Sequence, residues 1–167
     1  MSEEKSQRKV AVILAADVVG YSTMMETNEE QTFENLKVCR DIIDSLISEY
    51  HGRIFNTAGD SVIAEFQSAV DAVVCSSEIQ KTLKERNDSN EESKSMKFRV
   101  GVNMGDVVIE GDNLYGEGVN VAARLEALAQ PGGICLSKNV HEIVYNKTNF
   151  DFHDLGEQKV KNTKVHA

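Results

Sequence analysis

The segment Lys9–Ala16, with the sequence KVAVILAA, constrains the fold more than any other part of the chain. It has the length of a β-strand and is short for a helix. It also lacks the alternation of apolar and polar residues that marks a strand with one face in water, so we expect it to be buried. The apolar run ends at Asp17, which places a carboxylate directly after a buried strand.

The following residues predict helices and strands in alternation. Apolar residues recur at helical spacing from Glu29 to Tyr50, and the pair His51–Gly52 ends that pattern. Two β-rich runs within Arg53–Phe66 are joined by Ala58–Gly59–Asp60, which predicts a hairpin with Asp60 at its tip. We also expect a turn over Val18–Ser22, helices over Ala69–Asn87, Gly118–Ala129 and Lys138–Tyr145, a polar loop over Asp88–Ser95, strands within Phe98–Ile109 broken at Gly105–Asp106, a turn over Gly111–Asn113, a strand over Ile134–Ser137, and two strands within Phe150–Val165 around Gly156.

This order, βαββαββαβαββ, contains a ferredoxin-like βαββαβ core with an extension. We therefore expect an α+β fold in which helices cover an antiparallel sheet. No internal boundary is evident, so residues 9–167 are expected to form one domain after a disordered tail over residues 1–8.

Charge and composition exclude several classes of protein. The net charge of −9 over 167 residues argues against nucleic acid as a partner, because phosphate backbones require clustered Lys and Arg. The three cysteines are odd in number and far apart, which does not suggest a disulfide framework or a metal cage. No apolar run is long enough to cross a membrane. We expect a cytoplasmic chain without a membrane segment.

Asp17 and Asp60 are the most informative pair of residues. The first and third elements of a βαββ arrangement lie side by side, so these carboxylates can converge on one pair of cations. Two carboxylates suit octahedral Mg²⁺ or Mn²⁺, and two such ions roughly 3.5–4 Å apart can act on an attacking and a leaving oxygen together. On the residues alone, two ordinary turn aspartates are an equal alternative.

Two further segments suggest a site for phosphate. Backbone N–H groups of Val18–Ser22 can form a concavity for an anion, although a plain connecting loop is the simpler interpretation. Asn120 and Arg124 are four residues apart on one expected helix, so their side chains share a face. An amide and a guanidinium there can orient a sugar and neutralise a phosphoryl group, but a solvated helix face is the alternative.

Taken together, four ordered motifs resemble those of the class III adenylyl and guanylyl cyclase homology domain, in its bacterial form. AADVVGYS is similar to the first metal segment of that family, NTAGDSVIAEF to its second metal hairpin, NLYGEGVNVAARLE to its transition-state helix, and LGEQKVKN to its late phosphate-binding strand. The resemblance extends from about Lys9 to Val165.

The resemblance implies a role for each matching residue. Asp17 and Asp60, with the Val18 carbonyl, would hold two ions of Mg²⁺ or Mn²⁺ per site. Asn120 would position the ribose and Arg124 would stabilise the α-phosphoryl group. The residues implied in phosphate binding are Val19, Gly20, Tyr21, Ser22 and Lys161. In this family the two halves of a site come from different subunits, which implies a homodimer.

The positions that select the base in the family hold Asn56 and Asn113 here. Adenylyl cyclases usually carry Lys and either Asp or Thr at these places, and guanylyl cyclases usually carry Glu and a small residue. The chain matches neither pattern, and an amide can both donate and accept. The resemblance favours ATP over GTP because adenylyl cyclases dominate the bacterial members.

The implied function is conversion of ATP to 3′,5′-cyclic AMP and pyrophosphate. The alternatives are a guanylyl or dual-specificity cyclase, and an inactive module of the same fold that dimerises or senses nucleotides. The GGDEF signature of diguanylate cyclases is absent. Because the last strand of this fold is expected to continue beyond Ala167, we also expect a longer protein with a C-terminal regulatory domain.

Overall fold

The computed structural model describes residues 7–160 and 163–167, and its elements follow the predicted order. The strands are β1 (Gln7–Val18), β2 (Arg53–Ala58), β3 (Ser61–Phe66), β4 (Phe98–Glu110), β5 (Asn113–Tyr115), β6 (Ile134–Leu136), β7 (Glu157–Val160) and β8 (Thr163–His166). The helices are α1 (Tyr21–Thr27), α2 (Glu29–Glu49), α3 (Ala69–Asp88), the short 3₁₀ helix Glu92–Lys94, α4 (Glu117–Leu128) and α5 (Lys138–Val144).

The sheet is built around β1. Its strand order is β2-β3-β1-β4-β5, and β6 pairs with β4 in parallel. β3 and β4 flank β1, and both are antiparallel to it. The residues from Ala11 to Ala16 are buried, as predicted from KVAVILAA, whereas Lys9 and Val10 at the start of that segment are exposed.

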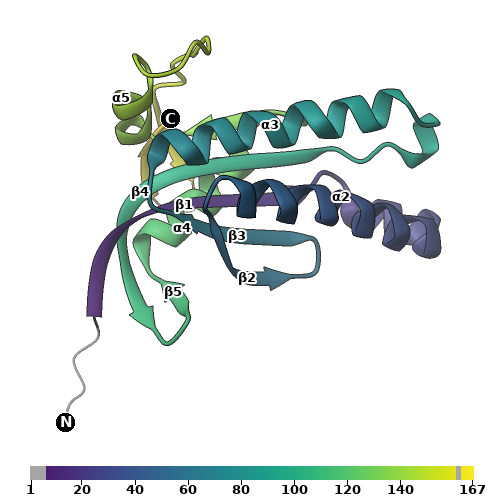
Figure 1. The fold of residues 1–167 in the computed structure, drawn as a ribbon, viewed down its shortest axis with the longest axis horizontal. Helices are drawn as coiled ribbons and strands as arrows, with labels where there is room; N and C mark the ends of the chain where they lie inside the picture. The colour runs from purple at the N-terminus through teal and green to yellow at the C-terminus, as the bar shows by residue number, and fades with distance from the viewer. Residues whose placement is uncertain (1–6, 161–162) are drawn as a thin grey trace.

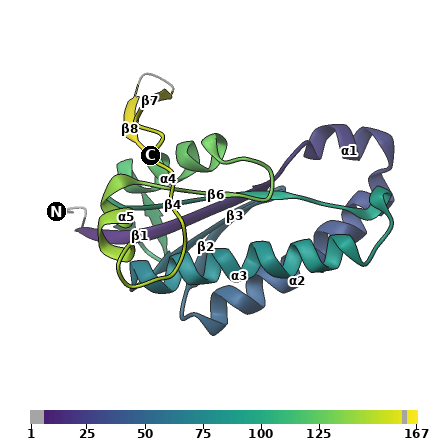
Figure 2. The same ribbon diagram turned by 90° about the horizontal axis from the view of Figure 1, so that it is seen from above.

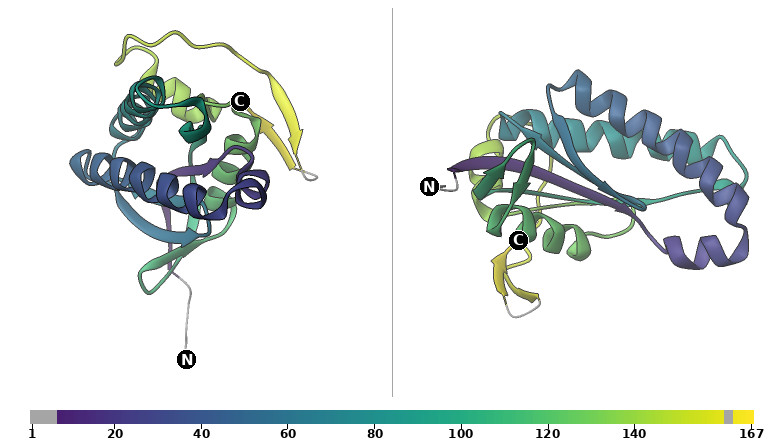
Figure 3. Two further views of the ribbon diagram at one scale, coloured as in Figure 1. Left: turned by 90° about the vertical axis from the view of Figure 1, so that its right-hand side faces the viewer. Right: turned by 90° about the horizontal axis from the view of Figure 1, so that it is seen from below.

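The two faces of the sheet are covered by different elements. Val12, Leu14 and Ala16 of β1 pack in a large core with residues of α2, α3 and α5, while Ala11, Ile13 and Ala15 pack in a second cluster that includes residues of α4 and β5. Figure 1 shows α2 and α3 running along the sheet, and Figure 2 shows them on one side of it with α4 on the other. The hairpin β7–β8 lies on the α4 side (Figure 3). The expected α+β fold with a helix-covered sheet is confirmed.

Three predicted details were wrong. β4 runs without a break through Gly105, which pairs with Ala11, and a Cβ at Gly105 would lie only 3.1 Å from the Gly118 Cα of α4. The glycine therefore allows a close approach by a helix and does not end the strand. The turn expected over Val18–Ser22 is shorter than predicted, because β1 includes Val18 and the short helix α1 begins at Tyr21. The final strand pair begins after Gly156 and does not surround it.

Other expectations hold or shift by a few residues. β1 begins at Gln7, so residues 7 and 8 belong to the strand and not to a tail. Cys39, Cys75 and Cys135 are buried and free. Among the residues described, no helix combines the length and apolar character needed to cross a membrane.

Candidate active site

Asp17 and Asp60 meet at one end of the sheet. Asp17 is the penultimate residue of β1, and Asp60 lies in the turn between β2 and β3. The backbone N–H of Val18 donates to Asp60 Oδ2 over 3.0 Å, which binds the hairpin tip to the end of β1. The predicted convergence of the two carboxylates is therefore present, and their role as metal ligands stays a prediction.

A third carboxyl group lies against Asp17. Glu126 of α4 is 7% exposed, and its Oε2 is 3.6 Å from the Nε of Arg99. Arg99 is the cross-strand partner of Asp17 in the β1–β4 register. Three buried atoms in this cluster have no hydrogen-bond partner among the described residues: Asp17 Oδ1, Arg99 Nε and Glu126 Oε2. A buried polar atom without a hydrogen bond destabilises the folded chain. The hydrogen-bonding capacity of this cluster is therefore not fully used within the described part of the chain.

The electrostatics of the cluster follow from its burial. Burial and the neighbouring Asp17 raise the pKa of Glu126 to about 8. Burial also raises the pKa of Asp17; contact with Glu126 opposes the shift, the charge of Asp60 adds to it, and Arg99 opposes it. Two carboxyl groups that share a low-dielectric environment cannot both ionise easily. The cluster therefore favours a proton or another cation beside Asp17.

The donor set fits divalent cations in part. Within residues 7–160 and 163–167, no group of three or more His, Cys, Asp and Glu side chains is arranged to hold a metal ion. Asp17 and Asp60 nevertheless supply two hard oxygen donors at one place, and Asp17 Oδ1 is buried without a partner. Mg²⁺ is commonly held by one or two carboxylates, with substrate phosphates and water completing its shell. The residues present fit that kind of site.

The buried residues of helix α4 and its predicted catalytic residues lie on opposite faces of the helix. Gly101 allows α4 to lie directly on β4, since a Cβ there would be 2.3 Å from the Glu126 backbone N and 2.5 Å from the Ala122 carbonyl O. Glu126 and Ala122 are buried on this side. Asn120 is exposed and Arg124 is half-buried on the other side. Within one chain, Asn120 and Arg124 therefore face away from the Asp17 carboxylate.

The segment after Asp17 is only partly available to an anion. The Val19 N–H donates to the Lys97 carbonyl over 2.8 Å, so this amide is already used. Gly20 has a φ of 69°, a left-handed conformation that suits glycine, and α1 begins at Tyr21. The amides of the first turn have no acceptor within the helix. Ser22 is exposed in that turn, and Lys161 lies outside the described residues.

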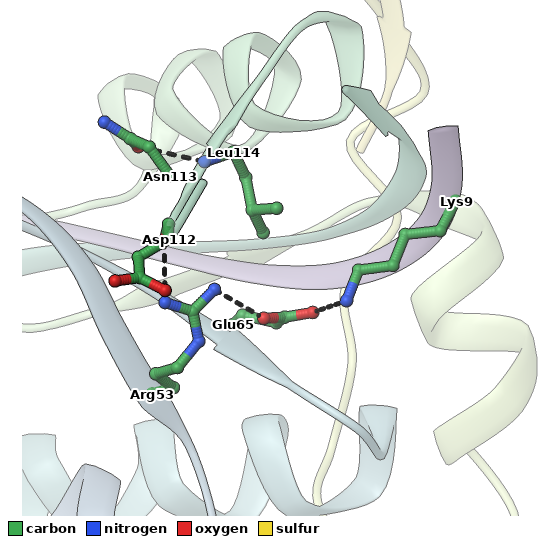
Figure 4. A network of polar contacts seen from close by, with 6 residues as sticks. All are labelled: Lys9, Arg53, Glu65, Asp112, Asn113 and Leu114. Carbon is green, nitrogen blue, oxygen red and sulfur yellow. Dashed lines mark hydrogen bonds and ion pairs between the residues drawn. The ribbon is translucent and has the colours of Figure 1, made fainter. Parts of the chain in front are cut away.

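Asn56 and Asn113 lie on two segments that border an open groove of about 550 Å³. The groove is lined by Arg53, Ile54, Phe55, Glu110, Asp112 and Asn113. The Leu114 N–H donates to Asn113 Oδ1 over 2.9 Å, and Asn113 Nδ2 donates to the Tyr115 hydroxyl over 3.1 Å. Figure 4 shows Asn113 and Leu114 beside the contacts of Arg53 with Asp112 and Glu65. Because a backbone N–H can only donate, it fixes which end of the Asn113 amide is the oxygen.

Sequence reasoning missed Glu126 and Arg99. One available signal was the helical spacing of Gly118, Ala122 and Glu126, which places an acidic residue on the apolar face of α4. The cross-strand position of Arg99 required the β1–β4 register, which no local pattern specifies.

Comparison with known proteins identifies the family of the chain. Residues 3–167 match the family model for the adenylate and guanylate cyclase catalytic domain. A putative adenylate cyclase 3 of Rhizobium meliloti (strain 1021) is 44% identical over 163 residues, which are 97% of this chain and 28% of that protein. The chain thus spans little more than a quarter of that relative.

Solved structures give the same result. An adenylate/guanylate cyclase/hydrolase from Silicibacter pomeroyi is 40% identical, with a TM-score of 0.90 over 97% of this chain and 96% of that one. The adenylyl cyclase CyaB from P. aeruginosa, at 24% identity, shares the fold with a TM-score of 0.84 over 98% of this chain and 94% of that one. Because the family model covers residues 3–167, the chain belongs to the adenylate and guanylate cyclase catalytic domain family.

Proposed function

We propose that this chain is the catalytic domain of a nucleotide cyclase that converts ATP to 3′,5′-cyclic AMP and pyrophosphate. The observation that carries the proposal is the junction of Asp17 and Asp60, where the hairpin tip is hydrogen-bonded to the end of β1. Asp17 Oδ1 is buried and receives no hydrogen bond from an N–H group of the described residues, and the Asp17 carboxyl group contacts a second acid, Glu126, which supports a cation as its partner. The raised pKa values of Asp17 and Glu126 support the same conclusion, because burial disfavours the ionised form of both acids unless a proton or another cation accompanies it.

In this proposal Asp17, Asp60 and the Val18 carbonyl hold two ions of Mg²⁺ or Mn²⁺. When bound, the ions would lower the pKa of the ribose 3′-hydroxyl and neutralise the triphosphate. The protein mainly positions the substrate for in-line attack on the α-phosphorus. Asn120 orients the ribose, and Arg124 stabilises charge on the α-phosphoryl group. Phosphate contacts are proposed for Val19, Gly20, Tyr21, Ser22 and Lys161, with the Val19 amide contributing least because Lys97 already accepts from it.

The opposite faces of α4 support a homodimer as part of this proposal. Because Asn120 and Arg124 face away from Asp17 in one chain, a single copy does not bring the two halves of the chemistry together. In a twofold dimer, the metal end of one chain can face Asn120 and Arg124 of its partner, and two equivalent sites result. We place the enzyme in the cytoplasm, where its nucleotide substrate is abundant.

ATP is the proposed substrate because the 44% identical relative is named a putative adenylate cyclase. GTP is the second candidate substrate, because of the orientation of the Asn113 amide. The Leu114 N–H fixes Asn113 Oδ1, so Nδ2 is the donor end of the Asn113 amide; one of its two N–H groups already donates to the Tyr115 hydroxyl, and the other can donate to a base. Guanine O6 and adenine N1 both accept such a bond, whereas the adenine amino group does not. We therefore propose a preference for ATP that is modest.

The experiment is turnover of the purified chain with ATP or GTP, each with Mg²⁺ or Mn²⁺, with the products separated by chromatography. We expect cyclic AMP and pyrophosphate in equal amounts, no product without a divalent ion, and slower formation of cyclic GMP. A chain that binds nucleotide but forms no cyclic product under any of these conditions would show an inactive module and overturn the proposal.

A further inference from the structure

The groove that borders Asn113 contains a charged network that the proposed reaction does not use. Arg53, at the start of β2, donates from Nη2 to Glu65 Oε1 over 3.0 Å and from Nη1 to the Asp112 carbonyl over 2.7 Å. Glu65 lies on β3 with a side chain that is 7% exposed, and Lys9 Nζ of β1 is 2.5 Å from its other oxygen. Figure 4 shows the resulting chain of contacts from Lys9 to Asp112.

This network joins segments that the sheet does not. β2 and β5 lie at opposite ends of the strand order β2-β3-β1-β4-β5. Among the hydrogen bonds of the described residues, the one from Arg53 to Asp112 is the direct link between β2 and the turn before β5. The planar guanidinium donates to a carboxylate and a carbonyl at once, a fork that an ammonium group does not reproduce.

The two linked segments carry the two proposed base-selecting residues. Asn56 lies three residues after Arg53 on β2, beyond an irregularity that shifts the register between Ile54 and Asn56. Asn113 directly follows Asp112, whose carbonyl Arg53 holds. The guanidinium therefore links the strand that carries Asn56 to the turn directly before the strand that carries Asn113.

The buried carboxylate of Glu65 restricts the position of the Arg53 guanidinium. Burial alone would raise the pKa of Glu65, but the hydrogen bonds from Lys9 and Arg53 outweigh it and the pKa is lowered. Glu65 is thus ionised at neutral pH and holds Arg53 in place through a charge-assisted bond. The Arg53 guanidinium also lies 5.9 Å from the centre of the Phe55 ring, which further restricts it.

We propose that Arg53, held by Glu65, is a positioning residue for base selection. It fixes the turn of Asn113 relative to the strand of Asn56 and has no contact with Asp17 or Asp60. This inference rests on the proposed function, because it concerns how the same site distinguishes two nucleotides. It predicts that selectivity and the rate of cyclisation can be separated by substitution at residue 53.

The test is Arg53→Lys, which keeps the charge beside Glu65 but loses the fork. Arg40→Lys is the matched control, because Arg40 also forms a forked pair, with Asp44, on α2. We expect Arg53→Lys to change the ratio of kcat/KM for ATP to that for GTP by about three- to tenfold, mainly through KM. Amide hydrogen exchange in residues 111–115 should become at least about threefold faster, and Arg40→Lys should change neither quantity.

The outcomes separate this inference from the proposed function. An active wild-type chain whose Arg53→Lys variant keeps both the nucleotide ratio and the exchange rates overturns the positioning role alone. A fall in kcat of the same factor for both nucleotides, with the ratio unchanged, also overturns it, because that pattern marks general damage. A wild-type chain that cyclises neither nucleotide overturns the proposed function and the positioning role together. Arg53→Gln, which removes the charge as well, provides a second variant with the same readouts.

Discussion

Two buried glutamates in this chain stand in opposite electrostatic environments. Glu65, in the network beside the groove, is paired with Lys9 and Arg53, and its pKa is lowered. Glu126, beside Asp17, has an oxygen without a hydrogen-bond partner, and its pKa is raised to about 8. Both side chains are about equally hidden, so burial alone does not decide the sign of the shift. The neighbouring charges decide it.

The two regions differ in whether their buried charged groups have partners within the chain. The network at Glu65 is satisfied within the chain and holds backbone segments in place. The cluster of Asp17, Arg99 and Glu126 has unpaired buried atoms, and burial raises the pKa of both of its acids. A region complete in itself suits positioning, whereas an incomplete one suits the binding of cations and phosphate. Substitutions in the two regions should therefore have different consequences.

The largest effect is expected at the incomplete region. Asp60→Ala removes a proposed metal ligand and the acceptor of the Val18 N–H. We expect cyclase activity to fall by at least about a thousandfold in a chain that still folds, although loss of the acceptor of the Val18 N–H should lower the thermal unfolding midpoint. Asp151→Ala, at an exposed aspartate outside the four motifs, is the matched control. Near wild-type turnover by Asp60→Ala at saturating Mg²⁺ would refute the metal assignment.

A smaller effect is expected at the groove. The double substitution Asn56→Lys with Asn113→Asp introduces the charged residues usual in adenylyl cyclases. A charge-assisted hydrogen bond contributes about 1.5–3 kcal/mol, against roughly 1 kcal/mol for a neutral one. We expect the ratio of kcat/KM values for ATP and GTP to rise about tenfold. Each single variant serves as a control, and an unchanged ratio in the double variant would mean that these positions do not select the base.

The paired glutamate gives a pH-dependent effect on stability. The folded-state pKa of Glu65 is below its ordinary value of 4.5, so its contribution is present above pH 4.5 and is lost as the pH falls through the folded pKa. Glu65→Gln should lower the free energy of unfolding at pH 7 by about 2 kcal/mol. Thermal unfolding across pH 3–8 measures it. A difference from wild type that stays constant as the pH falls below 4.5 would contradict this account.

The unpaired glutamate should respond in the opposite direction. Since the folded-state pKa of Glu126 is about 8, against an ordinary value of 4.5, its contribution is present below pH 4.5 and is lost as the pH rises toward 8. Glu126→Gln should match wild type at pH 4 and stabilise the metal-free chain at pH 8 by about 1 kcal/mol, or roughly 2–4 °C. Scans of metal-free protein test this, and a Glu126→Gln variant less stable than wild type at pH 8 would contradict it.

How far the sequence predicts this molecule depends on the range of the interactions. The buried strand, the hairpin at Asp60 and the long helix α2 follow from local periodicity and turn residues, and all three are present. The convergence of Asp17 and Asp60 follows from strand adjacency. The role of Gly105 and the contact between Glu126 and Asp17 depend instead on how closely α4 packs on β4, which is a tertiary property.

The Arg53 network could not be predicted for the same reason. Arg53 and Asp112 are 59 residues apart, and the strand of Arg53 and the strand that follows Asp112 lie at opposite ends of the sheet order. No local pattern links them. The family motifs indicate which residues take part in the reaction, and only the packed structure indicates what holds the selective residues in place.

The most direct test of the central claim is complementation between two inactive chains. Asp17→Ala removes the metal end and Arg124→Ala removes the opposite face of α4, so each homodimer should be inactive. Co-expression with two different affinity tags allows the heterodimer to be isolated, and in it one site keeps both intact halves. We expect the heterodimer to have about half of the wild-type activity per dimer, because one of its two sites functions. A heterodimer as inactive as its parents would contradict a site assembled from two chains.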